Sequence, residues 1–132
     1  MRTFWAIAIG AAVGGVSRFY LSAAVQHRMG ITFFPWGTLL INVTGSIALG
    51  FIMRFAVSTP ALSIEMRALL TTGFCGGYTT FSTYSYETAT LIEDGQLGRA
   101  GTYALASVLL ALAGTFGGFA LAREVIALRQ RA

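Results

Sequence analysis

The sequence predicts an all-α membrane protein with four transmembrane helices, the third of them broken at a Gly-rich segment. Hydrophobic residues make up 55% of the chain and charged residues 11%, against about 25% charged residues in soluble domains. The hydrophobic residues fall into four long runs divided by short turn-forming stretches. One crossing takes roughly 20 residues, so four crossings use about 80 of the 132 residues and leave about 50 for loops and tails. Residues 1–132 are therefore expected to form a single four-helix transmembrane domain.

The four helices are expected at approximately residues 4–25, 36–57, 69–92 and 100–122. The segments between them contain Gly, Pro and charged residues, which favour turns. These residues are His27, Arg28, Gly30 and Pro35 in the first segment, Pro60, Glu65 and Arg67 in the second, and Glu93, Asp94, Gly95 and Arg99 in the third. The first run begins like a secretory signal, but it continues past a typical apolar core to Val25, which favours a helix over a cleaved leader.

The charged and reactive residues exclude several classes of function. All nine basic residues are Arg, and they are scattered singly between apolar runs, so no basic patch is present to hold a nucleic acid. Without Lys and with a single His27, the chain lacks a P-loop, a Schiff-base lysine and a nucleophile–histidine pair of the usual kind. A lone Cys75 cannot form an intrachain disulfide. The sequence therefore predicts neither an enzyme nor a nucleic-acid partner.

Arginines are unequally divided between the two expected sides of the membrane. Six lie on the side of the termini, namely Arg2, Arg54, Arg67, Arg123, Arg129 and Arg131. Two, Arg28 and Arg99, lie on the other side, and the ninth, Arg18, lies within the first run. The positive-inside rule then favours cytoplasmic termini in a multi-pass protein of the plasma (inner) membrane.

The third run, LLTTGFCGGYTTFSTYSYETATLI, is too polar to face lipid. Gly73, Gly76 and Gly77 fall within five positions and are followed by five hydroxyl residues interleaved with aromatic ones. Irregular backbone at membrane depth survives only inside protein or along a cavity, so this run predicts a broken helix that lines a pathway. The alternative is a Gly/Thr packing seam, which is our interpretation of the Gly10/Gly14 and Gly114/Gly118 pairs. The pathway is favoured for the third run because a seam does not require so many hydroxyls.

Counting about 1.5 Å of rise per residue from the start of each run places four polar or aromatic residues at one level. Arg18, Asn42, Phe81 and Ser107 all come about 10 Å below the outer face of a core about 30 Å thick. The expected break at residues 76–79 falls close to the midplane by the same count. The sequence therefore predicts an off-centre polar layer beside a broken backbone.

Each residue of this layer also has a simpler structural explanation. Arg18 either extends to the outer interface or acts within the membrane, where charges are usually functional, and Glu87 is a candidate partner for it. Asn42 is alternatively a hydrogen-bond donor across helices. Ser107 and Thr115 share one face of the fourth helix, and either hydroxyl could instead satisfy a carbonyl one turn earlier.

Two longer stretches and one shorter one carry a specific resemblance. GTLLINVTGSIALG at residues 37–50, GFCGGYTTFSTYSYE at residues 73–87 and GGVSRFY at residues 14–20 resemble the signatures of the Fluc (CrcB) fluoride channel family. The resemblance covers essentially the whole chain. It implies a passive fluoride channel that protects microorganisms from fluoride, built as an antiparallel, dual-topology dimer with two pores and a structural sodium ion at its centre.

The resemblance also implies roles for single residues. Phe81 and Tyr84 match a pair of phenylalanines whose ring edges face fluoride, so the second ring is a tyrosine here. Asn42 matches the pore asparagine. The other matches are Tyr103, Ser107 and Thr115 on the polar track of the fourth helix, Gly76 and Thr79 at the carbonyls that hold sodium, and Arg18 and Glu87 at recurring charged positions. Ala111 lacks the hydroxyl that some members carry in the middle of that track.

The chemistry of the ion agrees with these assignments. Fluoride is small and strongly hydrated, so a pore must replace its water with other donors. The Asn42 amide, Thr and Ser hydroxyls such as those of Thr80 and Ser82, and the positive edges of aromatic rings are donors of this kind. Full dehydration without them would cost tens of kcal/mol.

One chain has too few helices to enclose a pathway, so a dimer in the lipid bilayer is expected. A two-fold axis in the membrane plane would turn one off-centre layer into two and bring the two midplane breaks together. Dual topology normally accompanies a balanced arginine distribution, which the 6 to 2 division lacks. The partner is therefore either an identical chain that inserts in spite of this bias or an oppositely oriented paralogous chain.

Two other classes of function fit a chain of this size. A small proton-coupled multidrug transporter also has four helices, but it needs an acidic residue in the first run, and residues 4–25 contain none. A noncatalytic membrane scaffold subunit explains the glycine pairs but not the hydroxyl and aromatic residues of the third run.

Overall fold

The computed structural model describes residues 1–30, 34–59 and 62–131, and within these ranges all regular secondary structure is helical, with no strand. Pro60, which was expected in the second turn, lies outside the described residues. The elements in chain order are α1 (Arg2–Arg28), α2 (Trp36–Ser58), α3 (Ile64–Ala68), η1 (Leu69–Cys75), α4 (Gly76–Tyr78), α5 (Phe81–Glu93) and α6 (Leu97–Arg131).

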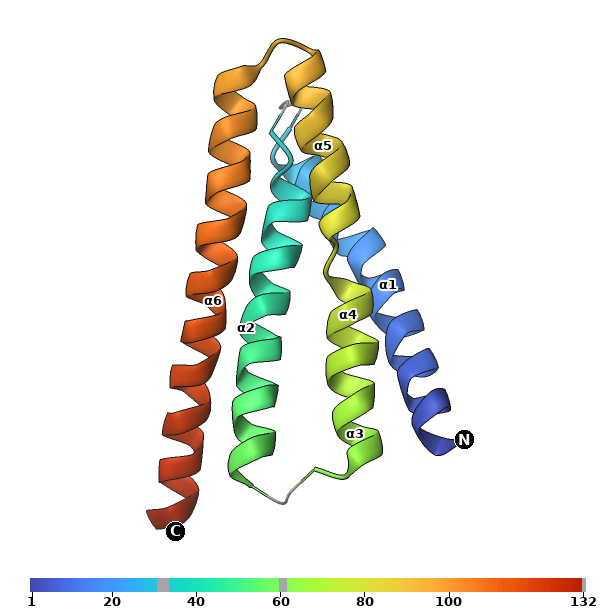
Figure 1. Cartoon of the computed structure of the whole chain (residues 1–132), viewed down its shortest axis with the longest axis vertical. Helices are drawn as coiled ribbons and strands as arrows, with labels where there is room; N and C mark the ends of the chain where they lie inside the picture. The colour runs from blue at the N-terminus through green and yellow to red at the C-terminus, as the bar shows by residue number, and fades with distance from the viewer. Residues whose placement is uncertain (31–33, 60–61, 132) are drawn as a thin grey trace.

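The elements form four rods, because α3, η1, α4 and α5 follow one another along a single column (Figure 1). α6 runs beside α2, the column of α3 to α5 lies on the other side of α2, and α1 leans away at the end that carries the N-terminus. Both termini lie at the same end of the bundle, as four crossings require. Among the described residues, α1, α2 and α6 are each long and apolar enough to span a membrane.

Two helix boundaries differ from the sequence prediction. Residues 64–68, expected within a turn, form α3, because Ser63 caps its start by accepting a hydrogen bond from the Met66 N–H at 3.1 Å. The fourth helix, expected to end at Ala122, continues to Arg131. Its last residues are mostly good helix formers, and the apolar run marks only where a helix leaves the hydrocarbon, not where it ends.

Glycines bring α1 and α6 close to their neighbours. A Cβ at Gly10 would overlap the Leu69 carbonyl oxygen, and one at Gly118 would overlap the carbonyl oxygen of Ile47. The seams expected at Gly10/Gly14 and Gly114/Gly118 are therefore present, α1 packing on η1 and α4, and α6 packing on α2.

Glycines of the third run belong to the same kind of contact. A Cβ at Gly77 would come within 2.6 Å of the Ala11 carbonyl oxygen, and one at Gly73 within 2.9 Å of that of Ile7. Both residues are in helical segments, Gly73 in the π-helical η1 and Gly77 in α4. Within the described column the backbone becomes extended after them, at Thr79 (φ −81°, ψ 158°) and Thr80 (φ −151°, ψ 115°). The packing interpretation therefore holds for these two glycines.

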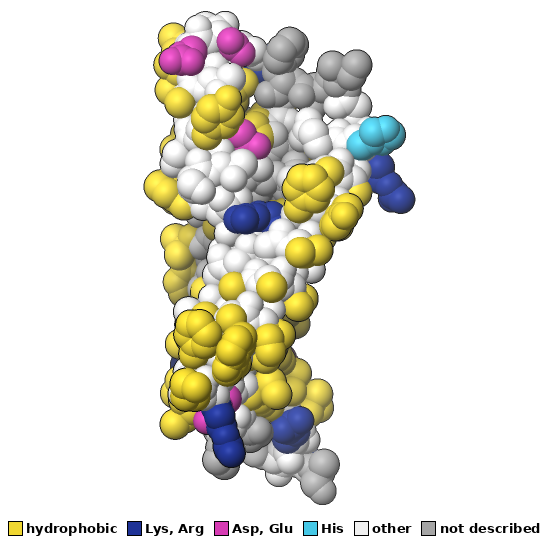
Figure 2. Space-filling view, turned by 90° about the vertical axis from the view of Figure 1, so that its right-hand side faces the viewer, with side chains coloured by type: hydrophobic (Ala, Val, Ile, Leu, Met, Phe, Trp, Pro, Cys, Tyr) yellow, Lys and Arg dark blue, Asp and Glu magenta, His cyan; other side chains and the backbone are white. Residues whose placement is uncertain are grey.

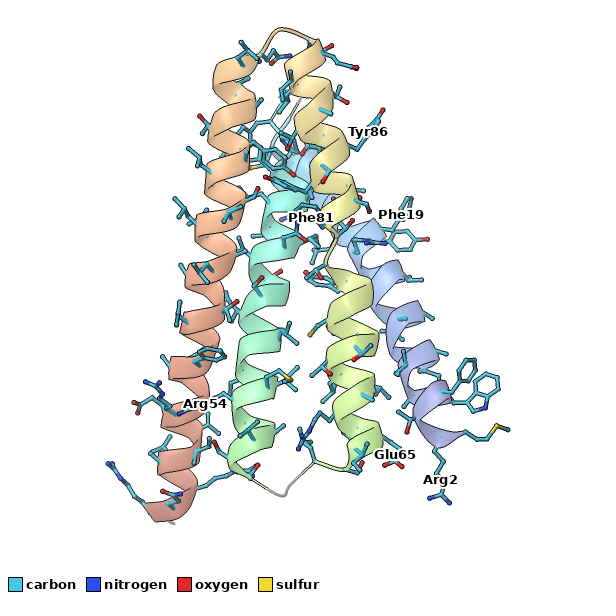
Figure 3. All side chains as sticks on the ribbon, in the orientation of Figure 1. Arg2, Phe19, Arg54, Glu65, Phe81 and Tyr86 are labelled. Carbon is cyan, nitrogen blue, oxygen red and sulfur yellow. The ribbon has the colours of Figure 1, made fainter. Side chains whose placement is uncertain are left out.

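Large hydrophobic side chains cover much of the outside. On the side shown in Figure 2 they extend along most of the molecule, and charged side chains gather mainly toward the two ends. Figure 3 places Arg2, Arg54 and Glu65 near the end that carries the termini. This division into an apolar length and charged ends is that of a bundle that crosses a membrane.

Candidate functional site

Asn42 of α2 holds the extended residues between α4 and α5. Its Nδ2 donates to the Thr80 carbonyl oxygen at 3.0 Å, and its Oδ1 accepts from the Thr80 N–H at 2.8 Å. The side-chain amide thus replaces the helical partners that Thr80 would have in a continuous helix. Asn42 does bond across helices, as its structural explanation requires, and its second Nδ2 hydrogen makes no bond to the described residues.

Thr80 also begins the next helix. Its Oγ1 accepts from the Thr83 N–H at 3.2 Å, which is the N-cap arrangement. The same hydroxyl lies 3.2 Å from the Ser82 Oγ and donates to the Thr83 Oγ1 at 3.0 Å. Thr80 and Ser82, both expected along the pathway, therefore belong to a hydroxyl network at the start of α5.

A cleft of about 270 Å³ opens beside this interruption. It is lined by Asn42, Gly45, Ser46 and Leu49 of α2, Thr79 and Thr80, Phe81 and Tyr84 of α5, and Ser107, Val108 and Ala111 of α6. The fold thus brings five of the expected pathway residues together at one place, namely Asn42, Thr80, Phe81, Tyr84 and Ser107. Tyr103, Thr115 and Ser82 are not among the lining residues.

Aromatic rings form a continuous series at one end of the cleft. The Phe81 and Tyr84 ring centroids are 5.4 Å apart, and those of Tyr84 and Tyr103 are also 5.4 Å apart. Tyr103 is completely buried, whereas Phe81 is 78% exposed in the single chain. Figure 3 shows Phe81 at the start of α5 and Tyr86 on the same helix pointing away from the bundle. Phe81 is therefore fixed by its neighbour on one side and uncovered on the other.

The two hydroxyls predicted on the fourth helix behave differently. Thr115 donates from Oγ1 to the Ala111 carbonyl oxygen at 3.1 Å, the local bond that is its simpler explanation. Ser107 is 6% exposed, and its Oγ has no hydrogen-bond partner among the described residues. Buried hydroxyls are normally paired, so Ser107 offers an unused donor to whatever occupies the cleft.

Glu87 and Arg18 lie together along a second, larger cavity of about 740 Å³ between α1, α2 and α5. Glu87 accepts from Thr38 Oγ1 at 2.8 Å and from the Tyr103 hydroxyl at 2.6 Å. Arg18 donates from Nη1 to the Thr79 carbonyl oxygen at 3.2 Å. In the described part of the chain no ion pair joins Arg18 to Glu87, although both residues line this cavity. Each charge is instead held by neutral groups.

The carbonyls expected to bind sodium lie at the interruption. Because the Thr80 N–H donates to Asn42, the Gly76 carbonyl oxygen loses the donor that a continuous helix would give it. The Thr79 carbonyl oxygen accepts from Arg18 and has a second lone pair. Carbonyl oxygens are suitable ligands for a hard cation, so the donor set fits sodium in type, with Arg18 as a competing positive charge at Thr79.

Two polar residues of α2 were missed by the sequence analysis. Thr38 binds Glu87, and Ser46 lines the cleft. Both were detectable, because Thr38, Asn42 and Ser46 recur every four residues and therefore share one face of a helix. The three polar residues are separated by mostly apolar ones, so the run as a whole has the composition of an apolar helix.

The apolar exterior and the helices long enough to cross a membrane define a multi-pass membrane protein. Between its helices lies a polar cleft that contains a buried hydroxyl without a partner among the described residues. A family model described as CrcB-like protein, Camphor Resistance (CrcB) matches residues 5–119, and the chain belongs to this family. It is therefore a multi-pass protein of the inner membrane.

Relatives of known name cover nearly the same length. The chain is 49% identical over 125 residues to a protein of Geobacter sulfurreducens, covering 95% of this chain and 100% of the relative. It is 47% identical over 118 residues to one of Roseiflexus sp., covering 89% and 94% of the two chains, and 41% identical over 125 residues to one of Aquifex aeolicus, covering 95% and 100%. Each of the three is named fluoride-specific ion channel FluC.

Proposed function

We propose that this protein is a passive fluoride-selective channel, not an enzyme, and that it lowers fluoride toxicity by letting the ion leave the cell. The observation that carries the proposal is the cleft beside Thr80, where an amide, an unpartnered buried hydroxyl and an exposed aromatic ring converge. The family and the names of the relatives support the same ion.

Fluoride transit through this cleft follows from its donors. The free Nδ2 hydrogen of Asn42 and the hydroxyl of Ser107 replace part of the hydration shell of the ion. The ring edge of Phe81 supplies a weak positive partner. The amide and hydroxyl are strong donors that favour entry of the ion, and the ring edge is a weak partner that lets it leave. Conduction requires both favourable entry and ready exit.

We further propose that the working unit is an antiparallel dimer with two pores. A single chain leaves Phe81 uncovered and the cleft open on one side. A second chain related by an axis in the membrane plane would close the cleft and join two off-centre layers into one path. Either an identical chain or an oppositely oriented paralogue satisfies this requirement.

A structural sodium ion at the dimer centre is part of the proposal. The carbonyl oxygens of Gly76 and Thr79 from both chains would hold it, and its positive charge would lower the barrier for a nearby anion. The freed Gly76 carbonyl supports this site. In a single chain Arg18 supplies positive charge at the same place.

Fluoride efflux from liposomes, followed with a fluoride electrode and with chloride measured in parallel, tests the function. We expect fast loss of fluoride without loss of chloride and without dependence on a proton gradient. Asn42→Asp keeps an acceptor for the Thr80 N–H but loses the donor and adds a negative charge, so it should abolish the flux. Thr90→Val, which removes an exposed hydroxyl bonded only to the Tyr86 carbonyl, is the matched control.

The same assay separates the alternatives. Flux that requires a proton gradient would identify a coupled transporter, and absence of flux from a folded dimer would contradict a homomeric channel. Reconstitution with a paralogous chain then distinguishes a heteromeric channel, which regains flux, from a scaffold subunit, which does not.

A further inference from the structure

Ser46 lines the cleft one helical turn beyond Asn42 on the same face of α2. It is half-buried, and its side-chain hydroxyl makes no hydrogen bond to any other described residue. Thr44, two residues away, shows the usual behaviour of a hydroxyl within a helix, since its Oγ1 donates to the Leu40 carbonyl oxygen at 2.8 Å. The Ser46 hydroxyl therefore keeps its hydrogen available, whereas the Thr44 hydroxyl donates its own to the helix backbone.

The α6 face opposite lacks a free hydroxyl at the same height. Gly114 packs against Val43 and Ile47, so Ser46 lies beside the stretch of α6 from Ala111 to Thr115. Ala111 lines the cleft with a methyl group only. Thr115 has already donated its hydroxyl hydrogen to the Ala111 carbonyl oxygen.

We propose that Ser46 is a fluoride-contacting residue that supplies, from α2, the donor that α6 lacks between Ser107 and Thr115. The inference rests on the proposed channel function. Fluoride that leaves the Asn42 amide and the Ser107 hydroxyl passes the apolar methyl of Ala111 and then meets the Ser46 O–H. A charged acceptor gains more from such a bond than a neutral one, so loss of this donor raises the barrier to transit.

Ser46→Ala tests the assignment in the liposome assay. We expect fluoride flux to fall about tenfold, a typical effect of removing one hydrogen bond to a charged group, while Ser46→Thr keeps most of the flux. Ser85→Ala is the matched control, because it removes a serine hydroxyl that bonds only to the Phe81 carbonyl oxygen and lies outside the cleft lining.

Adding Ala111→Ser to Ser46→Ala should restore flux, since it returns a hydroxyl to the same stretch from the opposite helix. A purely structural role of Ser46 would not be repaired in this way. If Ser46→Ala fails to fold, Ser46→Thr and Ser46→Val provide a pair of equal shape that differs by the hydroxyl.

The outcomes separate the two proposals. No flux through the wild-type protein overturns the channel. Wild-type flux that is unchanged by Ser46→Ala, or lost in a way that Ala111→Ser does not reverse, overturns the role of Ser46 and leaves the channel standing.

Discussion

The hydroxyl of Tyr103 donates to the Glu87 Oε2 at 2.6 Å, from a ring that is completely buried. The other carboxylate oxygen accepts from Thr38. One acidic residue thus joins α5, α2 and α6 at the end of the bundle where the aromatic series ends. A carboxylate that accepts two short bonds is a strong tie between helices, because bonds to a charged acceptor are about twice as strong as neutral ones.

Tyr103→Phe should lower the stability of the protein by about 1.5–3 kcal/mol, because it leaves one oxygen of a half-buried carboxylate without its donor. The midpoint of thermal unfolding in detergent measures this effect. Tyr86→Phe, next to Glu87 in the sequence but with a side chain that is 73% exposed, is the control and should leave the midpoint unchanged. Equal midpoints for the two variants would show that the Tyr103 bond contributes nothing to the fold.

Gly118 and Gly117 allow a direct test of the α2–α6 packing. They are adjacent in sequence, but only Gly118 lies against α2. A Cβ at Gly118 would lie 2.7 Å from the Phe51 nitrogen and overlap the Ile47 carbonyl, whereas one at Gly117 would meet nothing within 4 Å. Gly118→Ala should destabilise the α2–α6 contact by about 1–3 kcal/mol. Gly117→Ala should raise stability by about 0.5–1 kcal/mol through helix propensity. Thermal unfolding of both variants provides the comparison, and a stabilising Gly118→Ala would contradict the packing seam.

Thr80→Ala removes the N-cap of α5 and should cost about 1 kcal/mol, while Thr80→Ser keeps a hydroxyl that caps at least as well and should leave stability nearly unchanged. Because the network at the start of α5 also positions Phe81, the alanine variant should lose fluoride flux at temperatures where the protein is still folded. Flux and unfolding measured on the same samples distinguish the two effects. Full flux in Thr80→Ala would show that the cap does not position the ring.

Hydropathy and spacing could predict the four rods, because membrane crossing imposes a length and an apolar composition. They could also place Asn42, Phe81 and Ser107 near one another, since a rise of about 1.5 Å per residue is enough for that estimate. The position of the extended residues could not be obtained in this way. Glycines suggested a break at residues 76–79, but Gly73 and Gly77 are used for close packing against α1.

Hydrogen-bond partners were the least predictable part of the site. Arg18 and Glu87 have opposite charges and lie along one cavity, yet Arg18 binds a carbonyl and Glu87 binds two hydroxyls. Partner choice depends on side-chain direction across helices, which one sequence does not contain. The same holds for the two hydroxyls of α6. The Thr115 hydroxyl donates to the Ala111 carbonyl and the Ser107 hydroxyl has no partner among the described residues, a difference that only the structure reveals.

Phe81→Ala tests the source of ion selectivity. Its ring is the most exposed part of the cleft lining and is fixed against Tyr84 on one side, so it is suited to act as a rigid wall that rejects larger halides. Removing the ring should lower the ratio of fluoride to chloride flux about tenfold, a change of about 1.4 kcal/mol in relative barrier height, which is within the range of a single aromatic contact. Parallel efflux of both ions from the same liposomes measures the ratio.

Phe116→Ala is the control for Phe81→Ala. It removes a 61% exposed ring from α6 outside the cleft and should leave the ratio of fluoride to chloride flux unchanged. Retention of full fluoride selectivity by Phe81→Ala would assign discrimination to the amide and hydroxyl donors, because those are the groups that remain to face the ion.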